Sequence, residues 1–173
     1  MENRVDETPP VPASSLARHP FLRGLRGHHL ERLATAAHRV TAPDRHRFFD
    51  EGGRADRFWL VETGRVGVDA HVPGRGLVVV ETLGRDAVLG WSWLFPPFQW
   101  RFGARALAPV RAVEFDARLV RTLCADDPEL GHELTRRFAE VMLDRLQATR
   151  MRLMDVYTHP GRIRPGETLW PDR

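Results

Sequence analysis

Between His38 and Phe115 the hydrophobic residues fall into short runs, separated by glycine, proline and aspartate about every eight to twelve positions. Valine, phenylalanine and tryptophan are frequent in these runs, which is typical of β-strands. The runs are 39–41, 47–49, 57–61, 65–70, 76–81, 87–89, 102–107 and 110–115. The pattern predicts about eight short strands in an antiparallel barrel, sandwich or jelly roll.

Helical patterns flank this β-rich segment. Hydrophobic residues between Leu16 and Ala34 recur at spacings that suit short helices. Asp116 is placed to cap another short helix, and Asp127-Pro128-Glu129 combines an N-cap, a proline at the first helical position and an acid in the first turn. The helix that begins there can run to about Tyr157. The fold class is therefore α+β: an antiparallel β-roll with short N-terminal helices and a long C-terminal helix.

The long helix has two apolar stripes. Leu130, Leu134, Phe138 and Val141 form a stripe that can pack on the β-roll. The second stripe steps alternately by four and three positions, as in a heptad seam: Thr135, Ala139, Met142, Leu146, Thr149, Leu153 and Val156. Because one domain rarely buries both, we expect a homodimer through this helix; the alternative is one broad stripe on a single core.

The ends of the chain lack this order. Residues 1–14 contain Pro9-Pro10-Val11-Pro12 and predict a disordered N-terminal segment, and residues 158–173, with three prolines, predict an irregular tail. Residues 15–157 then form one domain that includes the long helix 127–157. No apolar stretch approaches the ~20 residues of a membrane span, and the N-terminus does not have the form of a secretion signal. We expect a cytoplasmic protein without membrane contact.

Charge and cysteine content exclude several classes of function. The chain has 26 arginines and no lysine, and its net charge is only +3. The arginines are spread along the chain and are not concentrated in one segment. Charge alone therefore does not indicate nucleic-acid binding. The single cysteine, Cys124, excludes an intramolecular disulfide and a cysteine metal cluster.

Catalytic and metal-binding motifs are also missing. The eight histidines are scattered, with only His28 and His29 adjacent, and do not show the paired spacing of a metal site on one strand. The sequence contains no serine nucleophile elbow, P-loop or dinucleotide-binding glycine motif. We predict no metal site, no resident cofactor and no enzyme activity.

The order of elements and several local motifs resemble the cyclic-nucleotide-binding domain of the catabolite-activator and anaerobic-regulator superfamily. The resemblance covers residues 19–157 and is carried by His19-Pro20-Phe21-Leu22, the run Leu60 to Val66 around Gly64, the turn Gly84-Arg85-Asp86 before Val88-Leu89-Gly90, and Arg105-Ala106. It implies a β-roll whose ligand site lies between a short helix after Gly90 and the following strand.

This implied site departs from the family pattern. In the family, free N–H groups at the short helix hold a phosphate with an arginine, and a glutamate after the glycine receives the ribose hydroxyl. Here Trp91 replaces that glutamate, and the arginine slot falls on Arg101 or on Trp100, depending on one residue of alignment. The candidate ligand-binding residues are Leu89, Gly90, Trp91, Ser92, Trp93, Trp100, Arg101, Ala104 and Arg105.

Six aromatic residues lie between Trp91 and Phe102. They can stack a planar ligand beside an arginine that counters an anion, or they can fill the pocket themselves. An open cavity with Arg101 or Arg105 facing it would favour the first alternative. A pocket filled by Trp91 and Trp100 would favour the second.

The leading hypothesis is a stand-alone regulatory domain. It would bind a small anionic or planar ligand, a cyclic nucleotide or an analogue, and signal through the C-terminal dimer helix. The alternative is a ligand-free module that binds a protein partner. The resemblance also implies that DNA-binding relatives carry a further domain of roughly sixty residues. Because the sequence ends sixteen residues after Tyr157, we expect no direct DNA binding.

Overall fold

The structure is a computed structural model that describes residues 10–158. Most of the predicted N-terminal segment and nearly all of the predicted tail therefore lie outside the described residues. The helical elements are α1 (Ala13–Leu16), the 3-10 helices η1 (Pro20–Leu22) and η2 (Ser92–Leu94), α2 (Gly27–Ala34), α3 (Ala117–Asp126) and α4 (Pro128–Thr158). The strands are β1 (Ala37–Ala42), β2 (Arg47–Phe49), β3 (Arg57–Val72), β4 (Gly76–Leu83), β5 (Val88–Leu89) and β6 (Gly103–Asp116).

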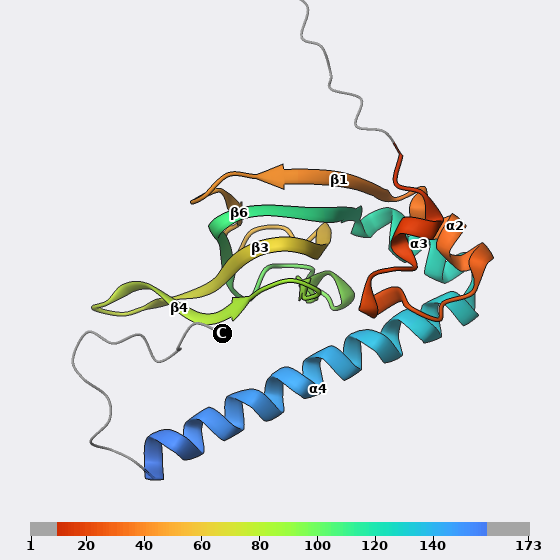
Figure 1. Ribbon diagram of the computed structural model, residues 1–173. Coiled ribbons are helices and arrows are strands. Elements are labelled where there is room, and N and C mark those ends of the chain that lie inside the picture. The colour runs from red at the N-terminus through yellow and green to blue at the C-terminus, as the bar shows by residue number, and fades with distance from the viewer. Residues whose placement is uncertain (1–9, 159–173) are drawn as a thin grey trace, which may run out of the picture.

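The strands form one antiparallel sheet of six strands, in the order β1-β6-β3-β4, with β2 paired to β6 and β5 paired to β3. The helices α1, α2 and α3 lie together at one end of this β-roll, and α4 runs along one side of it (Figure 1). This arrangement confirms the predicted α+β fold class. Among the described residues, no helix is long and apolar enough to cross a membrane.

The roll has six strands rather than the predicted eight, because two pairs of predicted runs merge. The break expected at Thr63-Gly64 is an irregularity inside β3, where the pairing with β6 shifts register between Val61 and Val66. Gly64 adopts φ +94°, and a Cβ there would collide with the carbonyl oxygen of Pro109. The glycine therefore allows β3 and β6 to approach closely while the strand continues, as in a β-bulge.

The helix start signals act as predicted. The Asp116 side chain accepts hydrogen bonds from the backbone N–H groups of Arg118 and Leu119, and Asp127 accepts one from the N–H of Leu130 at 3.2 Å. Each carboxylate satisfies N–H groups that a helix leaves free at its start. Asp127 is the single residue between α3 and α4.

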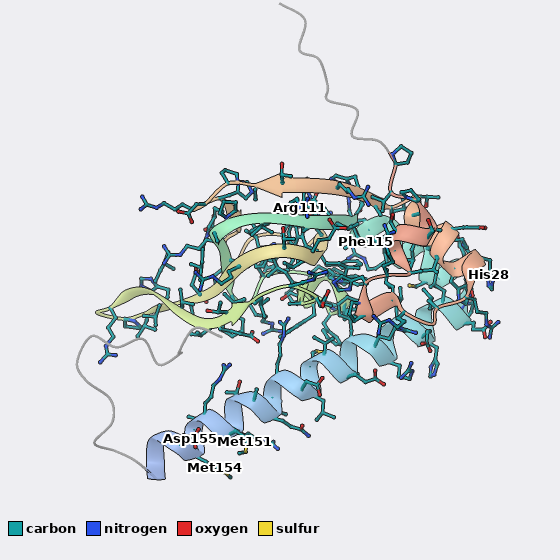
Figure 2. All side chains as sticks on the ribbon, in the orientation of Figure 1. His28, Arg111, Phe115, Met151, Met154 and Asp155 are labelled. Atoms are coloured by element: carbon teal, nitrogen blue, oxygen red, sulfur yellow. The ribbon has the colours of Figure 1, made fainter. Side chains whose placement is uncertain are left out.

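The first half of α4 is packed and the second half is largely exposed. Leu130, Leu134 and Phe138 of the first predicted stripe are buried in the hydrophobic core, and the Phe138 ring contacts Phe58 of β3. Beyond Val141 the helix carries exposed apolar side chains, which include Leu143, Leu146, Met151, Leu153 and Met154. Figure 2 shows Phe115 among the packed elements and Met151 and Met154 on the last turns of α4.

Candidate functional site

A cavity of about 390 Å³ lies between the β-roll and α4. Its walls come from β2, β3, β4, the segment around Gly90, Trp100 and α4. The residues that line it are Phe49, Val68, Val80, Glu81, Leu89, Gly90, Trp91, Ser92, Trp100, Phe102, Met142, Arg145, Leu146 and Thr149. Most of these side chains are apolar and four of them are aromatic. The walls therefore suit a planar, largely apolar group.

Trp100 lines the cavity and is packed in place. Its ring stacks on Phe49 with centroids 3.8 Å apart, and only 5% of the residue is exposed. Gly90 adopts φ +90°, and a Cβ there would lie 2.9 Å from the Trp100 ring. The absence of a side chain at Gly90 thus makes room for the indole ring. The ring occupies part of the pocket but leaves the cavity open beside it.

Arg145 of α4 supplies the positive charge of the cavity wall. Its guanidinium lies over the Trp91 ring, 4.5 Å from the ring centroid, and donates a hydrogen bond to the backbone carbonyl oxygen of Val88. Its Nε lies 3.4 Å from Oε1 of Glu81. One side chain of the long helix therefore contacts β4, β5 and the segment after Gly90.

Burial affects both members of this ion pair. It lowers the pKa of Arg145, and the negative charge of Glu81 opposes that shift. It raises the pKa of Glu81, and Arg145 and Arg152 oppose that shift. Both effects arise because a charged group loses hydration when it is buried. An anionic group that entered the cavity would compete with Glu81 for the guanidinium.

The nine predicted site residues fall into three groups. Leu89, Gly90, Trp91, Ser92 and Trp100 line the cavity. Trp93 and Ala104 are buried and do not line it: Trp93 stacks on Phe58 at 5.1 Å between centroids, and Ala104 lies opposite Phe49 in the β2–β6 pair. Arg101 and Arg105 are exposed and are not among the lining residues.

The sequence predicted that the positively charged side chain of the site would be Arg101 or Arg105 of the β-roll. In the structure the arginine that lines the cavity is Arg145 of α4. The helix pattern contained a signal for this position. Arg145 is seven residues after Phe138, which is two helical turns, so it continues the buried stripe with a charged residue. A charged residue at such a position needs a partner across the interface, and Glu81 provides it.

Comparisons with known proteins agree with this architecture. A family model described as "Cyclic nucleotide-binding domain" matches residues 39–127. The chain is 29% identical over 150 residues to a CRP-like cAMP-activated global transcriptional regulator of Mycobacterium tuberculosis. That match covers 86% of this chain and 65% of the regulator, so the chain spans less than two thirds of that relative's length.

Solved structures give the same result. A Geobacter metallireducens protein assigned as a cyclic nucleotide-binding protein superposes with a TM-score of 0.72 at 25% identity, covering 79% of this chain and 98% of that chain. The Thermus thermophilus catabolite activator protein superposes with a TM-score of 0.62 at 17% identity, over 80% of this chain and 63% of that chain. The second likeness supports the fold alone.

Proposed function

The chain belongs to the cyclic nucleotide-binding domain family, and on this premise we propose that its cavity binds a small anionic or planar ligand and reports binding through α4. The observation that carries the proposal is that α4 itself supplies part of the cavity wall. Met142, Arg145, Leu146 and Thr149 line the same space as residues of the β-roll. A ligand in this space therefore contacts both parts of the domain, and the protein acts as a regulatory sensor.

The walls indicate the class of ligand. Phe49 and Trp100 form a stacked pair at one side, and the Trp91 ring is covered by the Arg145 guanidinium. Since Phe49 and Arg145 each cover one face of these indoles, a planar ring would stack on the other face of Trp100 or Trp91, and an anionic group can pair with Arg145. A cyclic nucleotide or an analogue has both features. Trp91 replaces the glutamate that the family uses for the ribose, which favours ligands that do not depend on that contact.

Signalling would follow from the position of Arg145. Its contacts with Glu81, Val88 and Trp91 hold the middle of α4 to the roll. A ligand that changes these contacts favours one position of α4 over another. This is a population shift between two arrangements of the helix.

We further propose that α4 pairs with α4 of a second copy. Leu146 and Leu153 of the heptad seam are 47% and 53% exposed. Their seven-residue spacing matches the repeat that lets two helices interlock along a common seam. Light scattering should show a dimer for the unmodified chain, and Leu153→Glu, which changes the seam outside the ligand cavity, should give a monomer. Arg150→Glu, an exposed site on the same helix, is the control.

Isothermal titration with cyclic AMP and cyclic GMP tests the ligand proposal. Arg145→Gln should weaken binding about 10- to 100-fold, because a hydrogen bond to a charged group contributes ~1.5–3 kcal/mol. Arg101→Ala should leave affinity unchanged, because Arg101 is exposed and does not line the cavity. If Arg101→Ala abolishes binding instead, the phosphate is held by the β-roll arginine.

The absence of heat with either nucleotide would reject the cyclic-nucleotide version of the proposal. Tryptophan fluorescence with other planar anions would then test the wider ligand class, since Trp91 and Trp100 line the cavity. If these ligands also fail, the alternative of a protein-interaction module is favoured. The stacking of Trp100 on Phe49 supports that alternative, because it fills part of the pocket with the protein's own rings.

A further inference from the structure

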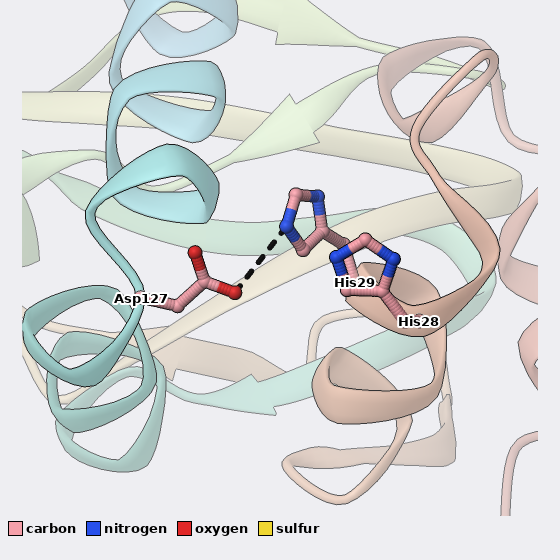
Figure 3. A group of neighbouring side chains, drawn as sticks. All are labelled: His28, His29 and Asp127. Carbon is pink, nitrogen blue, oxygen red and sulfur yellow. Dashed lines mark ion pairs between the residues drawn. The ribbon is translucent and has the colours of Figure 1, made fainter.

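Two histidines of α2 lie beside an aspartate that is distant in sequence, at the junction of α3 and α4 (Figure 3). His28, His29 and Asp127 each offer one potential ligand atom, and these atoms all lie within 4.8 Å of one another. Imidazole nitrogen and carboxylate oxygen are common zinc ligands. None of the three residues lines the cavity described above.

The buried ring of His29 faces Asp127 but makes no hydrogen bond through Nε2. The residue is 2% exposed, and its Nε2 has no hydrogen-bond partner among the residues that the structure describes. Figure 3 shows the ring facing the carboxylate of Asp127, with Nε2 3.3 Å from Oδ2. A buried polar nitrogen usually makes a hydrogen bond, and a metal ion held between this nitrogen and the Asp127 carboxylate would give it a direct ligand bond instead.

The distances suit a metal with small rearrangement. With bonds of 2.0–2.2 Å, ligand atoms around a tetrahedral zinc ion lie about 3.4 Å apart, which matches the separation of His29 and Asp127. His28 must move closer, and its exposed side chain is free to rotate toward solvent or toward the site. Its ring already lies 4.0 Å from the His29 ring, measured between centroids.

Arg32 would compete with a metal ion for the Asp127 carboxylate. Its guanidinium donates a hydrogen bond of 3.1 Å to Oδ2 of Asp127, the oxygen that faces His29. The other oxygen, Oδ1, accepts the hydrogen bond that caps α4. The cap and the metal would therefore use different oxygens. The Arg32 side chain is about a third exposed (35%), so it can turn to solvent when a cation takes its place.

We propose that His28, His29 and Asp127 form a zinc-binding site with a water as the fourth ligand. Because Asp127 is the single residue between α3 and α4, the bound ion would tie α2 to the start of the long helix. The site is independent of the ligand cavity, so zinc binding and nucleotide binding can fail separately. The histidine spacing alone did not predict it, because the third ligand comes from a distant part of the chain.

Titration of the chelator-treated protein with Zn²⁺ tests the proposal, with Co²⁺ absorption as a second readout of a tetrahedral site. One Zn²⁺ should bind per chain. His28→Ala should weaken binding at least about tenfold, as should Asp127→Asn, in which the asparagine can still cap α4. Arg32→Gln should tighten binding, because it removes the competing cation. Asp127→Asn and His28→Ala avoid the buried His29, so loss of folding would not obscure the result.

His71→Ala is the matched control, since His71 is exposed on β3 and lies outside this group. It should bind Zn²⁺ with unchanged affinity and give an unchanged Co²⁺ spectrum. The proposal is overturned if His28→Ala and Asp127→Asn bind Zn²⁺ as tightly as the unmodified chain. It is also overturned if His71→Ala lowers affinity as much as they do, since binding would then reflect scattered surface histidines.

Discussion

Phe138 packs the first half of α4 onto the β-roll. It is fully buried, and its ring meets three others edge to face: Phe21 at 4.7 Å, Trp93 at 5.4 Å and Phe58 at 5.5 Å between centroids. Phe138→Ala should destabilise the fold by about 3–5 kcal/mol, because it removes these contacts and leaves a cavity. At ~2–4 °C per kcal/mol for a chain of this size, the melting temperature should fall by roughly 6–20 °C.

Urea and thermal unfolding followed by circular dichroism measure this loss. Leu143→Ala is the matched control, because Leu143 lies on the same helix but is 52% exposed. Its free energy of unfolding should stay within about 0.5 kcal/mol of that of the unmodified chain. If Phe138→Ala costs less than about 1 kcal/mol, comparable to a surface change, the packing of α4 through this ring is refuted.

Three further changes test other contacts. Gly90→Ala should lower the melting temperature more than Gly74→Ala, because both glycines have positive φ (+90° and +76°) but only at Gly90 would a Cβ meet the Trp100 ring. Asp69→Ala should cost about 3 kcal/mol in urea unfolding, since it removes the buried carboxylate that accepts two hydrogen bonds from Arg47, at 2.5 and 2.9 Å. Arg136 and Arg137 lower the pKa of Glu133 from 4.5 to about 2, so this carboxylate stabilises the fold above pH 4.5 and loses that effect as pH falls toward 2. Melting temperatures between pH 6 and 3 should therefore fall less steeply in Glu133→Gln than in the unmodified chain.

Local sequence signals predicted the elements of the fold but not their joining. The caps at Asp116 and Asp127 and the proline at position 128 depend only on neighbouring residues, and the helices begin where these signals indicate. The predicted break at Gly64 was wrong, because a glycine that follows threonine is also compatible with a bulge. Only the long-range pairing of β3 with β6, which brings Pro109 against Gly64, distinguishes the two.

The residues of the candidate site could also be predicted only in part from the sequence. The segment from Leu89 to Ser92 and Trp100 could be located because the resemblance fixed their place in the roll, and they do line the cavity. The resemblance did not indicate whether the side chains of Arg101 and Arg105 point into the cavity or away from it. Arg105 lies between the buried Ala104 and Ala106, and alternate residues of a strand face opposite sides, so its side chain points outward. This alternation of small residues around an arginine is visible in the sequence.

The helix pattern places Arg145 on the buried stripe of α4, but the groups that it contacts depend on how α4 crosses the roll. That crossing also gives the helix two unlike attachments. Up to Phe138 it is held by buried apolar contacts, which a ligand in the cavity cannot replace. At Arg145 it is held by an ion pair with Glu81 and a contact with Trp91, which a ligand with an anionic group and a flat ring can replace. We therefore expect ligand binding to move the second half of α4 while the first half stays packed, and the exposed seam that includes Leu146 and Leu153 lies on the part that moves.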